Sequence, residues 1–294
     1  MTDSDPGPGG NHGRGQDAGP EGDVLVERAA DGVATITLNA PRRRNSITLD
    51  LARDLVAACR ALNDDPSVGA TVIRAAGPVF CSGADRALLA RVGSDPSSED
   101  NVRDLMTIYS SFSSVANLAM PTIAAVQGAA LGAGLNLVLS ADLCLVTEET
   151  RLLSGFLPIG VHPGGGHFTL LAKRTNPQIA AAMALFGQEL VGDAAVEAGL
   201  AFEACTAARL YPRAVELAAV AGADPALSRK ALDSFRAQTG LPQAQATGTR
   251  IELAAQMWSM ARSRRPVDQA VDQAGPAVAP GGRAVAPGEG RTRS

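Results

Sequence analysis

Two short runs of small residues, each near an apolar strand-like segment, constrain most strongly how this 294-residue chain can fold. One run spans residues 80–85 (FCSGAD) and the other spans residues 127–134 (QGAALGAG). The neighbouring apolar segments are residues 70–73 and 123–126, whose pattern is typical of buried strands. Small side chains let a ligand approach the backbone closely. If the fold brings the two runs together, two backbone N–H groups can point at one carbonyl oxygen, as in an oxyanion hole.

Strand patterns alternate with helix patterns before the C-terminal third of the chain. Residues 24–28 and 33–39 alternate between apolar and polar side chains, and the Asp31-Gly32 turn between them predicts an opening hairpin. Further strands are expected at residues 70–75, 121–126 and 142–146. Helices are expected from Thr48 to about Pro66, at 134–140 and at 177–186. This alternation predicts an α/β core.

Helix signals alone follow in the C-terminal third. Asp224-Pro225 combines a capping residue with a first-turn proline, so a helix is expected from there to Gly240. Thr249 and Glu252 form a capping box, which predicts that the next helix begins at Thr249. The side chains that share one face are Leu227, Ala231 and Phe235 on the first helix and Ile251, Ala255 and Trp258 on the second. An α-helical region is therefore expected after the core.

Four segments follow from this organisation. Residues 1–22 are rich in Gly, Pro and Asp and lack an apolar period, so they are expected to be a disordered tail. Residues 23–200 form the predicted core, and residues 201–265 form the predicted helical region. Residues 266–294 repeat both Val-Asp-Gln-Ala and Ala-Val-Ala-Pro-Gly, which is typical of a disordered tail.

Composition argues against several classes of function. The net charge of -4 and the pI near 5.5 argue against nucleic-acid partners. The four cysteines are scattered, with no CxxC pair or Cys/His cluster, so neither a metal site nor a disulfide framework is expected. A signal-peptide core is missing, and no run of about eighteen apolar residues could span a membrane. We therefore expect a soluble cytoplasmic protein with no membrane partner.

The glycine-rich run at residues 127–134 could also indicate a nucleotide-binding site. Gly132 and Gly134 would begin a dinucleotide fingerprint, but the position of its third glycine is Leu137. The sequence contains no Gly-Lys-Ser/Thr for a P-loop and no Gly-x-Ser-x-Gly for a hydrolase nucleophile elbow. Dinucleotide-binding, P-loop and serine-hydrolase functions are therefore disfavoured.

Six motifs stand in a distinctive order along the chain. They are residues 41–46 (PRRRNS), 80–85 (FCSGAD), 121–128 (PTIAAVQG), Ala133-Gly134 with Ala141-Asp142, 160–166 (GVHPGGG) and 195–200 (AVEAGL). In this order they resemble the crotonase superfamily, the enoyl-CoA hydratase/isomerase family. The resemblance implies a crotonase-like β-β-α spiral with an α-helical C-terminal trimerisation region, a homotrimer or hexamer, and an acyl-CoA thioester as ligand. It implies no cofactor beyond the coenzyme A of that thioester.

The resemblance also assigns roles to individual residues. It places the two oxyanion N–H groups on Ser82 and Ala133. It implies contacts with coenzyme A at Arg42, Arg43, Arg44, Ala84, Asp85 and Gly164. Arginine suits phosphate independently of the family, because its planar guanidinium donates two parallel hydrogen bonds. Asp85 and Asp142 are expected mainly to hold their own turns by hydrogen bonds.

Two positions depart from the family's hydratases, which use two glutamates to hold and deprotonate water. Those positions are Asn136 and Phe156 in this chain. Neither side chain accepts a proton at neutral pH, so standard water addition is not expected. Asn136 can still hydrogen-bond a water or a substrate oxygen. His162 and His167 flank the glycine loop, which contains Gly164, Gly165 and Gly166. His162 is the leading candidate for acid–base work.

The sequence therefore predicts an acyl-CoA-processing enzyme that stabilises a thioester enolate with non-standard acid–base groups. Ser154 and Glu148 are further candidates for those groups. A lyase, an isomerase, a hydrolase and a decarboxylase all remain open, because one oxyanion hole serves them all. The alternative is a catalytically silent acyl-CoA-binding or assembly protein, since both carboxylate positions are lost.

Overall fold

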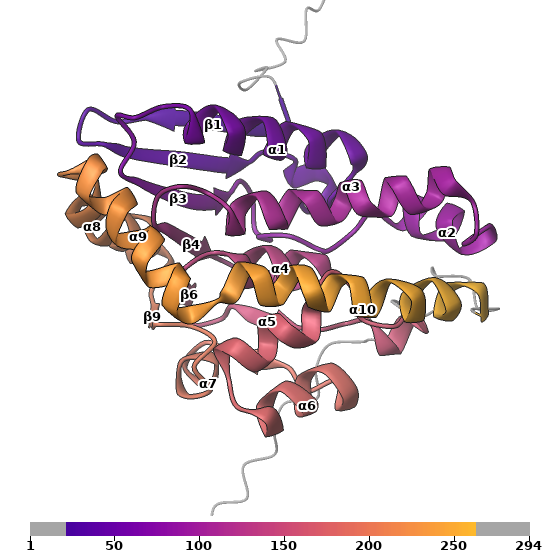
Figure 1. The fold of residues 1–294 in the computed structure, drawn as a ribbon. Coiled ribbons are helices and arrows are strands. Elements are labelled where there is room, and N and C mark those ends of the chain that lie inside the picture. The colour runs from indigo at the N-terminus through magenta and orange to yellow at the C-terminus, as the bar shows by residue number, and fades with distance from the viewer. Residues whose placement is uncertain (1–21, 263–294) are drawn as a thin grey trace, which may run out of the picture.

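The computed structural model describes residues 22–262, which form a main sheet, a smaller second sheet and surrounding helices (Figure 1). The N-terminal tail expected at 1–22 lies outside the described residues apart from Gly22. The tail expected at 266–294 lies outside them entirely.

The main sheet has six strands in the order β1-β2-β3-β4-β6-β9. They are β1 (Val24–Arg28), β2 (Val33–Leu38), β3 (Ala70–Ala75), β4 (Thr122–Val126), β6 (Leu143–Thr147) and β9 (Glu203–Cys205). The pairing of β1 with β2 is antiparallel, which confirms the predicted hairpin, and every later pair is parallel. Strand β9 lies in the segment that the sequence predicts to be helical, so the sheet extends beyond residue 200.

Helices surround this sheet, with two short 3-10 helices among them. They are η1 (Pro41–Arg43), α1 (Leu49–Asn63), α2 (Arg86–Ser94), α3 (Glu99–Ala116), α4 (Ala133–Ser140), η2 (Leu157–Ile159), α5 (His167–Arg174), α6 (Pro177–Phe186), α7 (Asp193–Glu197), α8 (Ala207–Gly222), α9 (Pro225–Thr239) and α10 (Leu241–Arg262). Thr48 caps α1 as predicted, because its hydroxyl accepts a hydrogen bond from the N–H of Leu51 at 3.1 Å.

Side chains of the central strands alternate between two cores. On one face, Val72 of β3 packs in a cluster with Leu210 and Ala214 of α8. On the other face, Ile73 of β3 belongs to the larger cluster, together with Leu55 of α1 and residues of α3 and α4. Because helices cover both faces, β2 is buried along its whole length.

The second sheet continues from the first. It contains β5 (Ala129–Leu131), β7 (Arg151–Leu153) and β8 (Leu190–Val191). The turn from β4 into β5 requires Gly128, whose φ is 68° and whose added Cβ would lie 1.8 Å from the carbonyl oxygen of Pro78. The chain runs from β4 through β5 into α4, and then from β6 through β7 toward α5. This repeated β-β-α path agrees with the predicted spiral.

Helix α10 corrects the capping-box prediction. It begins at Leu241, so Thr249 and Glu252 lie inside it and do not start it. Its inner face buries four polar side chains, Gln245, Glu252, Gln256 and Ser259, beside the apolar Met260. Ile251 and Trp258, which share the apolar stripe, are 72% and 58% exposed. The helix therefore turns several polar groups toward the protein, while two large apolar side chains face outward.

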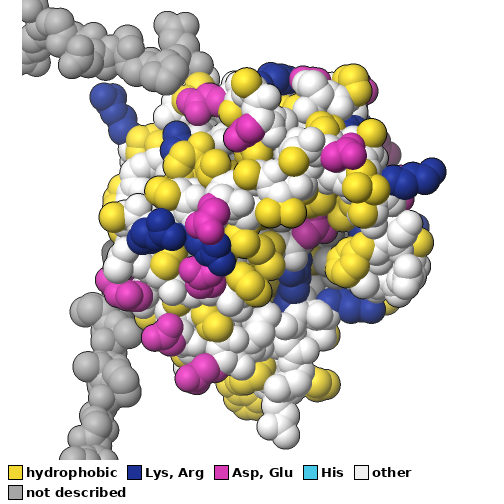
Figure 2. All heavy atoms as spheres, turned by 90° about the vertical axis from the view of Figure 1, so that its left-hand side faces the viewer, with side chains coloured by type: hydrophobic (Ala, Val, Ile, Leu, Met, Phe, Trp, Pro, Cys, Tyr) yellow, Lys and Arg dark blue, Asp and Glu magenta, His cyan; other side chains and the backbone are white. Residues whose placement is uncertain are grey.

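Helix α9 is confirmed, because the carboxylate of Asp224 caps it by accepting the N–H of Leu227 at 3.0 Å. Its apolar face is nevertheless exposed, by 65% at Leu227 and 57% at Phe235. These side chains line a groove between α8 and α9 that also includes Val220. Figure 2 views this end of the molecule and shows hydrophobic side chains exposed among charged ones.

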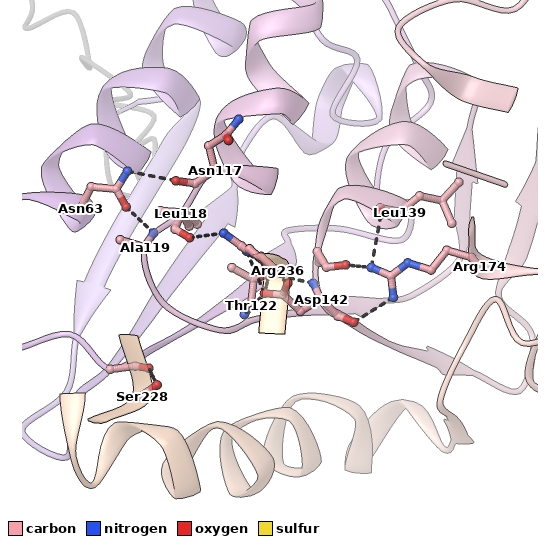
Figure 3. Close-up of polar contacts among 12 residues, drawn as sticks. Asn63, Asn117, Leu118, Ala119, Thr122, Leu139, Asp142, Arg174, Ser228 and Arg236 are labelled. Carbon is pink, nitrogen blue, oxygen red and sulfur yellow. Dashed lines mark hydrogen bonds and ion pairs between the residues drawn. The ribbon is translucent and has the colours of Figure 1, made fainter. Parts of the chain in front are cut away.

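The predicted structural role of Asp142 is confirmed by the contacts in Figure 3. Its carboxylate accepts the backbone N–H of Thr122 at 2.9 Å and the guanidinium of Arg236 at 3.0 Å. Arg236 also donates to the carbonyl of Leu118 at 2.6 Å. Arg174 donates to the backbone carbonyl of Asp142 at 2.8 Å. These contacts fasten α5 and α9 to the N-terminal ends of β4 and β6.

Candidate functional site

The fold places the two small-residue runs side by side, as the sequence predicts. Cys81 in the first run donates its N–H to the carbonyl of Ala129 at 3.1 Å and accepts the N–H of Leu131 at 3.1 Å. Gly134 is required at this contact, because a Cβ there would lie 2.5 Å from the carbonyl oxygen of Cys81. Only a residue without a side chain lets α4 begin this close to the first run.

Ser82 does not supply a free N–H group, so its predicted role as an oxyanion donor is wrong. Its N–H donates to the carbonyl of Arg44 at 3.0 Å. That hydrogen bond joins the arginine-rich segment to the first run. An N–H that is already committed to the fold cannot also bind a substrate oxygen at full strength.

Ala84, two residues further on, has a backbone N–H that is not used by the fold. Ile47 donates to the carbonyl of Gly83 at 2.8 Å and accepts the N–H of Asp85 at 3.0 Å. Successive backbone groups of an extended segment point in opposite directions, so the N–H of Ala84 points away from Ile47. Among residues 22–262 no acceptor is found for it. The contact of Ala84 with coenzyme A stays a prediction, and the structure adds that its backbone N–H is unpaired.

Ala133 supplies the second unpaired N–H. It is the first residue of α4, and the first N–H groups of a helix have no acceptor within the helix. The partial positive charge at a helix N-terminus also favours an anion there. Its nitrogen lies 3.9 Å from the point where a Cβ on Gly83 would stand. The N–H groups of Ala84 and Ala133 therefore come from two turns in direct contact.

The arginine-rich segment is held against the first run by one buried amide. The side chain of Asn45 accepts the N–H of Ala40 at 2.8 Å and donates to the carbonyls of Ala76 and Val79 at 2.9 and 2.8 Å. Asn45 is fully buried and has a φ of 51°, a backbone conformation that asparagine tolerates better than most residues. This amide fixes where the three arginines lie.

The three arginines differ in exposure and in whether their guanidinium groups already have a partner. Arg43 forms an ion pair with Asp23 and is half-buried. Arg42 and Arg44 are exposed, and no partner is found for their guanidinium groups among the described residues. Asp85 accepts the N–H of Leu88 at 3.1 Å and caps α2, which confirms its expected structural role. Arg42 and Arg44 therefore remain the cations available to a phosphate.

Asn136 lies at one end of a buried chain of hydrogen bonds. Its amide nitrogen donates to the carbonyl of Gly164 at 2.9 Å, which leaves its oxygen to face Nδ1 of His167 at 2.7 Å. That oxygen can only accept, so Nδ1 carries the proton. Nε2 of His167 then accepts the hydroxyl of Ser154 at 2.7 Å. All three side chains are at most 1% exposed.

The imidazole of His167, in the middle of these hydrogen bonds, is held neutral. Burial lowers the pKa of His167 to about 3. Phe156 packs edge-on against it with ring centroids 4.9 Å apart, and its ring lies 3.7 Å from the point where a Cβ on Gly132 would stand. The two positions that depart from the hydratase pattern, Asn136 and Phe156, thus meet around one neutral histidine. No carboxylate takes part in this group.

His162 is placed differently from His167. Its backbone N–H donates to the hydroxyl of Ser259 at 2.7 Å, and its Nδ1 lies 2.6 Å from the carbonyl of Pro163. A carbonyl only accepts, so Nδ1 carries a proton, and in the neutral ring Nε2 has a free lone pair. The ring packs edge-on against Phe168 at 5.6 Å between centroids and is half-buried. Nε2 has no hydrogen-bond partner within residues 22–262.

Glu252 is the buried carboxylate nearest to the glycine loop. It accepts the N–H groups of Gly166 at 2.8 Å, His167 at 3.0 Å and Phe168 at 3.1 Å. Burial raises its pKa, against the effect of these three donors. Glu252 therefore caps α5 from the middle of α10 and holds His167 in place. The sequence pattern identified this residue as a cap but gave the wrong helix.

Other kinds of site are not found in the described part of the chain. Residues 22–262 contain no group of three or more His, Cys, Asp or Glu side chains that could hold a metal ion. None of the helices described is long and apolar enough to cross a membrane. Glu148 is exposed and lies in the turn after β6.

Comparisons with known proteins give a consistent picture. A family model described as enoyl-CoA hydratase/isomerase matches residues 28–273. The probable enoyl-CoA hydratase EchA14 of Mycobacterium tuberculosis is 40% identical over 193 residues, which cover 66% of this chain and 73% of the relative. The trans-2-decenoyl-(acyl-carrier-protein) isomerase of Streptococcus mutans is 27% identical over 186 residues, covering 63% of this chain and 71% of the relative.

Solved structures of similar proteins share the fold. An enoyl-CoA hydratase/isomerase from Xanthobacter autotrophicus superposes with a TM-score of 0.72 at 28% identity, over 88% of this chain and 100% of the other. An enoyl-CoA hydratase from Bacillus halodurans has a TM-score of 0.76 over 86% of this chain and 100% of the other. At 19% identity the second similarity concerns the fold alone. The predicted crotonase-like fold is confirmed.

Proposed function

This chain belongs to the enoyl-CoA hydratase/isomerase family, and we propose that it binds an acyl-CoA thioester and polarises its carbonyl with the N–H groups of Ala84 and Ala133. The observation that carries the proposal is the pair of unpaired N–H groups on two turns in contact. Two hydrogen bonds to the carbonyl oxygen stabilise the charge that develops there when a proton leaves the neighbouring carbon. The product of that step is a thioester enolate.

The coenzyme A part of the ligand is recognised by arginine in this proposal. Arg42 and Arg44 are exposed, and the backbone carbonyl of Arg44 accepts the N–H of Ser82. Their guanidinium groups can pair with phosphate oxygens by two parallel hydrogen bonds. Arg43 is less suited to this role, because Asp23 already neutralises it.

Proton transfer on the enolate, rather than addition of water, is the reaction that the side chains support. Asn136 cannot take a proton, Phe156 has no polar atom, and buried His167 stays neutral. His162 keeps an unpaired Nε2 and is the proposed proton carrier. One group that removes a proton from one carbon and returns it to another is sufficient for double-bond isomerisation. We therefore favour an isomerase over a hydratase.

A solvent-exchange experiment tests this function. Purified protein is titrated with butyryl-CoA and crotonyl-CoA, and deuterium uptake from D2O at the α carbon of butyryl-CoA is followed by mass spectrometry. We expect binding and exchange without hydration of crotonyl-CoA. His162→Gln should lower the exchange rate at least about 100-fold without loss of binding. Ser259→Ala is the control, because it removes the hydroxyl that accepts the backbone N–H of His162 and donates to the carbonyl of Gln256 but leaves the imidazole itself in place.

Two results would count against the proposal at different points. Rapid hydration of crotonyl-CoA would contradict the choice of reaction, and failure to bind any acyl-CoA would contradict the function. Binding without exchange would favour a second candidate, a catalytically silent acyl-CoA-binding protein. That candidate is motivated by Asn136, whose side-chain oxygen and nitrogen are both engaged by the fold.

Assembly into a homotrimer or hexamer is also part of the proposal. Several exposed apolar side chains lie on the C-terminal helices α8, α9 and α10, where Val220 is 81%, Phe235 is 57% and Trp258 is 58% exposed. Large exposed apolar side chains that lie together mark interaction surfaces. Burial against a second copy of the chain would explain why α8, α9 and α10 turn these residues outward.

A further inference from the structure

Two buried polar atoms without hydrogen-bond partners meet beside Gly164. They are Oη of Tyr109, from α3, and Oε1 of Gln256, from α10. Tyr109 is 5% exposed and Gln256 is 3% exposed, so water around the protein does not reach them. Buried polar groups are nearly always paired in proteins, because an unpaired one loses its hydrogen bonds to water without replacement.

The two oxygens converge on the same small space. A Cβ added to Gly164 would lie 2.1 Å from Oε1 of Gln256 and 2.5 Å from Oη of Tyr109. Atoms so placed are at most about 5 Å apart, a separation that one oxygen atom can bridge with two hydrogen bonds of about 2.8 Å each. Only glycine fits at position 164, because any side chain there would collide with both oxygens.

Gln256 is an exception among its neighbours on the inner face of α10. Gln245 donates to the hydroxyl of Ser140 at 3.3 Å, and Glu252 caps α5. Ser259 accepts the N–H of His162 and donates to the carbonyl of residue 256. Every other buried polar side chain of this face thus has a protein partner. The free oxygen of Gln256 is a local feature of the space beside Gly164.

This space adjoins the proposed thioester site. The carbonyl of Gly164 accepts the side-chain amide of Asn136, and Asn136 lies one helical turn after Ala133 on the same face of α4. Helical side chains lean toward the helix N-terminus, so the Asn136 amide lies over the turn that begins with Ala133. Gly164 is therefore one hydrogen bond away from the helix that carries the proposed donor Ala133.

We propose that Tyr109 and Gln256 form a subsite for one O–H group, which accepts a hydrogen bond from the tyrosine and donates one to the glutamine oxygen. A carbonyl oxygen would satisfy only Tyr109, and an ammonium group would satisfy only Gln256, so a hydroxyl fits the pair best. The O–H group is supplied by a hydroxyl on the acyl chain or by a bound water molecule. The first source rests on the proposed function, and the second does not.

The first measurement compares urea unfolding of the wild type and Tyr109→Phe, without ligand. Tyr211→Phe is the matched control, because the hydroxyl of Tyr211 has a partner, Thr35, at 3.0 Å. If water occupies the subsite, Tyr109→Phe should lower the unfolding midpoint about as much as the control does. If the hydroxyl of Tyr109 is unpaired in the free protein, its removal should leave the midpoint unchanged or raise it.

The second measurement compares the affinities of hexanoyl-CoA and its 3-, 4-, 5- and 6-hydroxy derivatives. If the acyl chain supplies the O–H group, one hydroxy derivative should bind roughly tenfold more tightly than hexanoyl-CoA, a difference of about 1.4 kcal/mol. Tyr109→Phe and Gln256→Leu should abolish that preference while leaving the affinity for hexanoyl-CoA unchanged. Failure of hexanoyl-CoA itself to bind would contradict the proposed function and leave the unfolding result to decide the subsite.

The proposal is overturned by one combination of results. These are an unfolding midpoint of Tyr109→Phe that is not lower than that of the wild type, together with no preference for any hydroxy derivative. Two unpaired atoms would then lie together without any ligand. A lowered midpoint alone identifies water as the O–H group, and a hydroxyl preference alone identifies the acyl chain.

Discussion

Replacing Ala133 with proline removes one proposed oxyanion donor while keeping the helix that carries it. Ala133 is the first residue of α4, a position where proline is favoured because that N–H has no partner within the helix. The preceding Gly132 has a φ of 53° and a ψ of -116°, the mirror image of the extended conformation favoured before proline. Glycine adopts mirror-image conformations without strain, so we expect Ala133→Pro to fold as the wild type does.

The size of the effect follows from one lost hydrogen bond to the developing oxyanion. Removing a single donor of this kind costs about 2.7–4 kcal/mol of transition-state stabilisation, roughly 100- to 1,000-fold in rate. Stability should change by less than about 1 kcal/mol, because the proline restricts the unfolded chain and breaks no hydrogen bond of the fold. Coenzyme A should still bind, since Arg42 and Arg44 are untouched.

The assay measures deuterium uptake at the α carbon of a saturating acyl-CoA in the wild type, Ala133→Pro and Asp193→Pro. Asp193 is a matched control, because it begins α7 after Gly192, which has a φ of 47° and a ψ of -116°. Uptake should fall at least about 100-fold in Ala133→Pro and stay unchanged in Asp193→Pro. The reasoning is refuted if folded Ala133→Pro exchanges within about threefold of the control.

Three further predictions concern stability, binding and assembly. Burial lowers the pKa of His167 from 6.5 to about 3, so below pH 6.5 the unfolded chain binds a proton that the fold excludes. The free energy of unfolding should therefore fall by up to about 1.4 kcal/mol per pH unit as the pH drops from 6.5 toward 3. In urea titrations His167→Gln should flatten this dependence and His162→Gln should not; equal slopes in all three proteins would contradict it. Arg42→Ala combined with Arg44→Ala should weaken coenzyme A binding several-fold, about 0.5–1 kcal/mol per arginine, in low-salt calorimetry. The loss should shrink in about 0.5 M salt, and unchanged low-salt affinity would argue against phosphate contacts there. Light scattering should show a trimer or hexamer for the wild type and smaller species for Phe235→Glu; a monomeric wild type would rule out the proposed assembly.

The contact between the two small-residue runs was predictable because composition constrains it directly. Gly134 meets the carbonyl of Cys81 too closely for any Cβ, and Gly128 has a positive φ at the turn into β5. Such positions stand out in a sequence because only glycine fits them. The resemblance to a known family then implied the β-β-α spiral around them.

The identity of the free N–H was not predictable from the same residues. Ser82 donates its N–H to the carbonyl of Arg44, a contact between segments about forty residues apart in sequence. Ala84 keeps its N–H because Ile47 bonds to the residues on either side of it. Both facts depend on which neighbouring strand faces which edge of the turn, and spacing within one motif carries no such information.

Helix α10 shows a second limit of the sequence patterns. Thr249 and Glu252 have the spacing of a capping box, yet Glu252 accepts three N–H groups at the start of α5. A carboxylate caps whichever helix end the fold brings to it. The chain from Asn136 through His167 to Ser154 was missed for the same reason, because its members come from α4, α5 and the end of β7.

A crystal structure with a bound acyl-CoA tests the central claim most directly. The account predicts that the thioester oxygen lies about 2.7–3.2 Å from the backbone nitrogens of both Ala84 and Ala133. It is contradicted if that oxygen contacts neither nitrogen, or if the pantetheine arm enters the protein elsewhere than between the two turns.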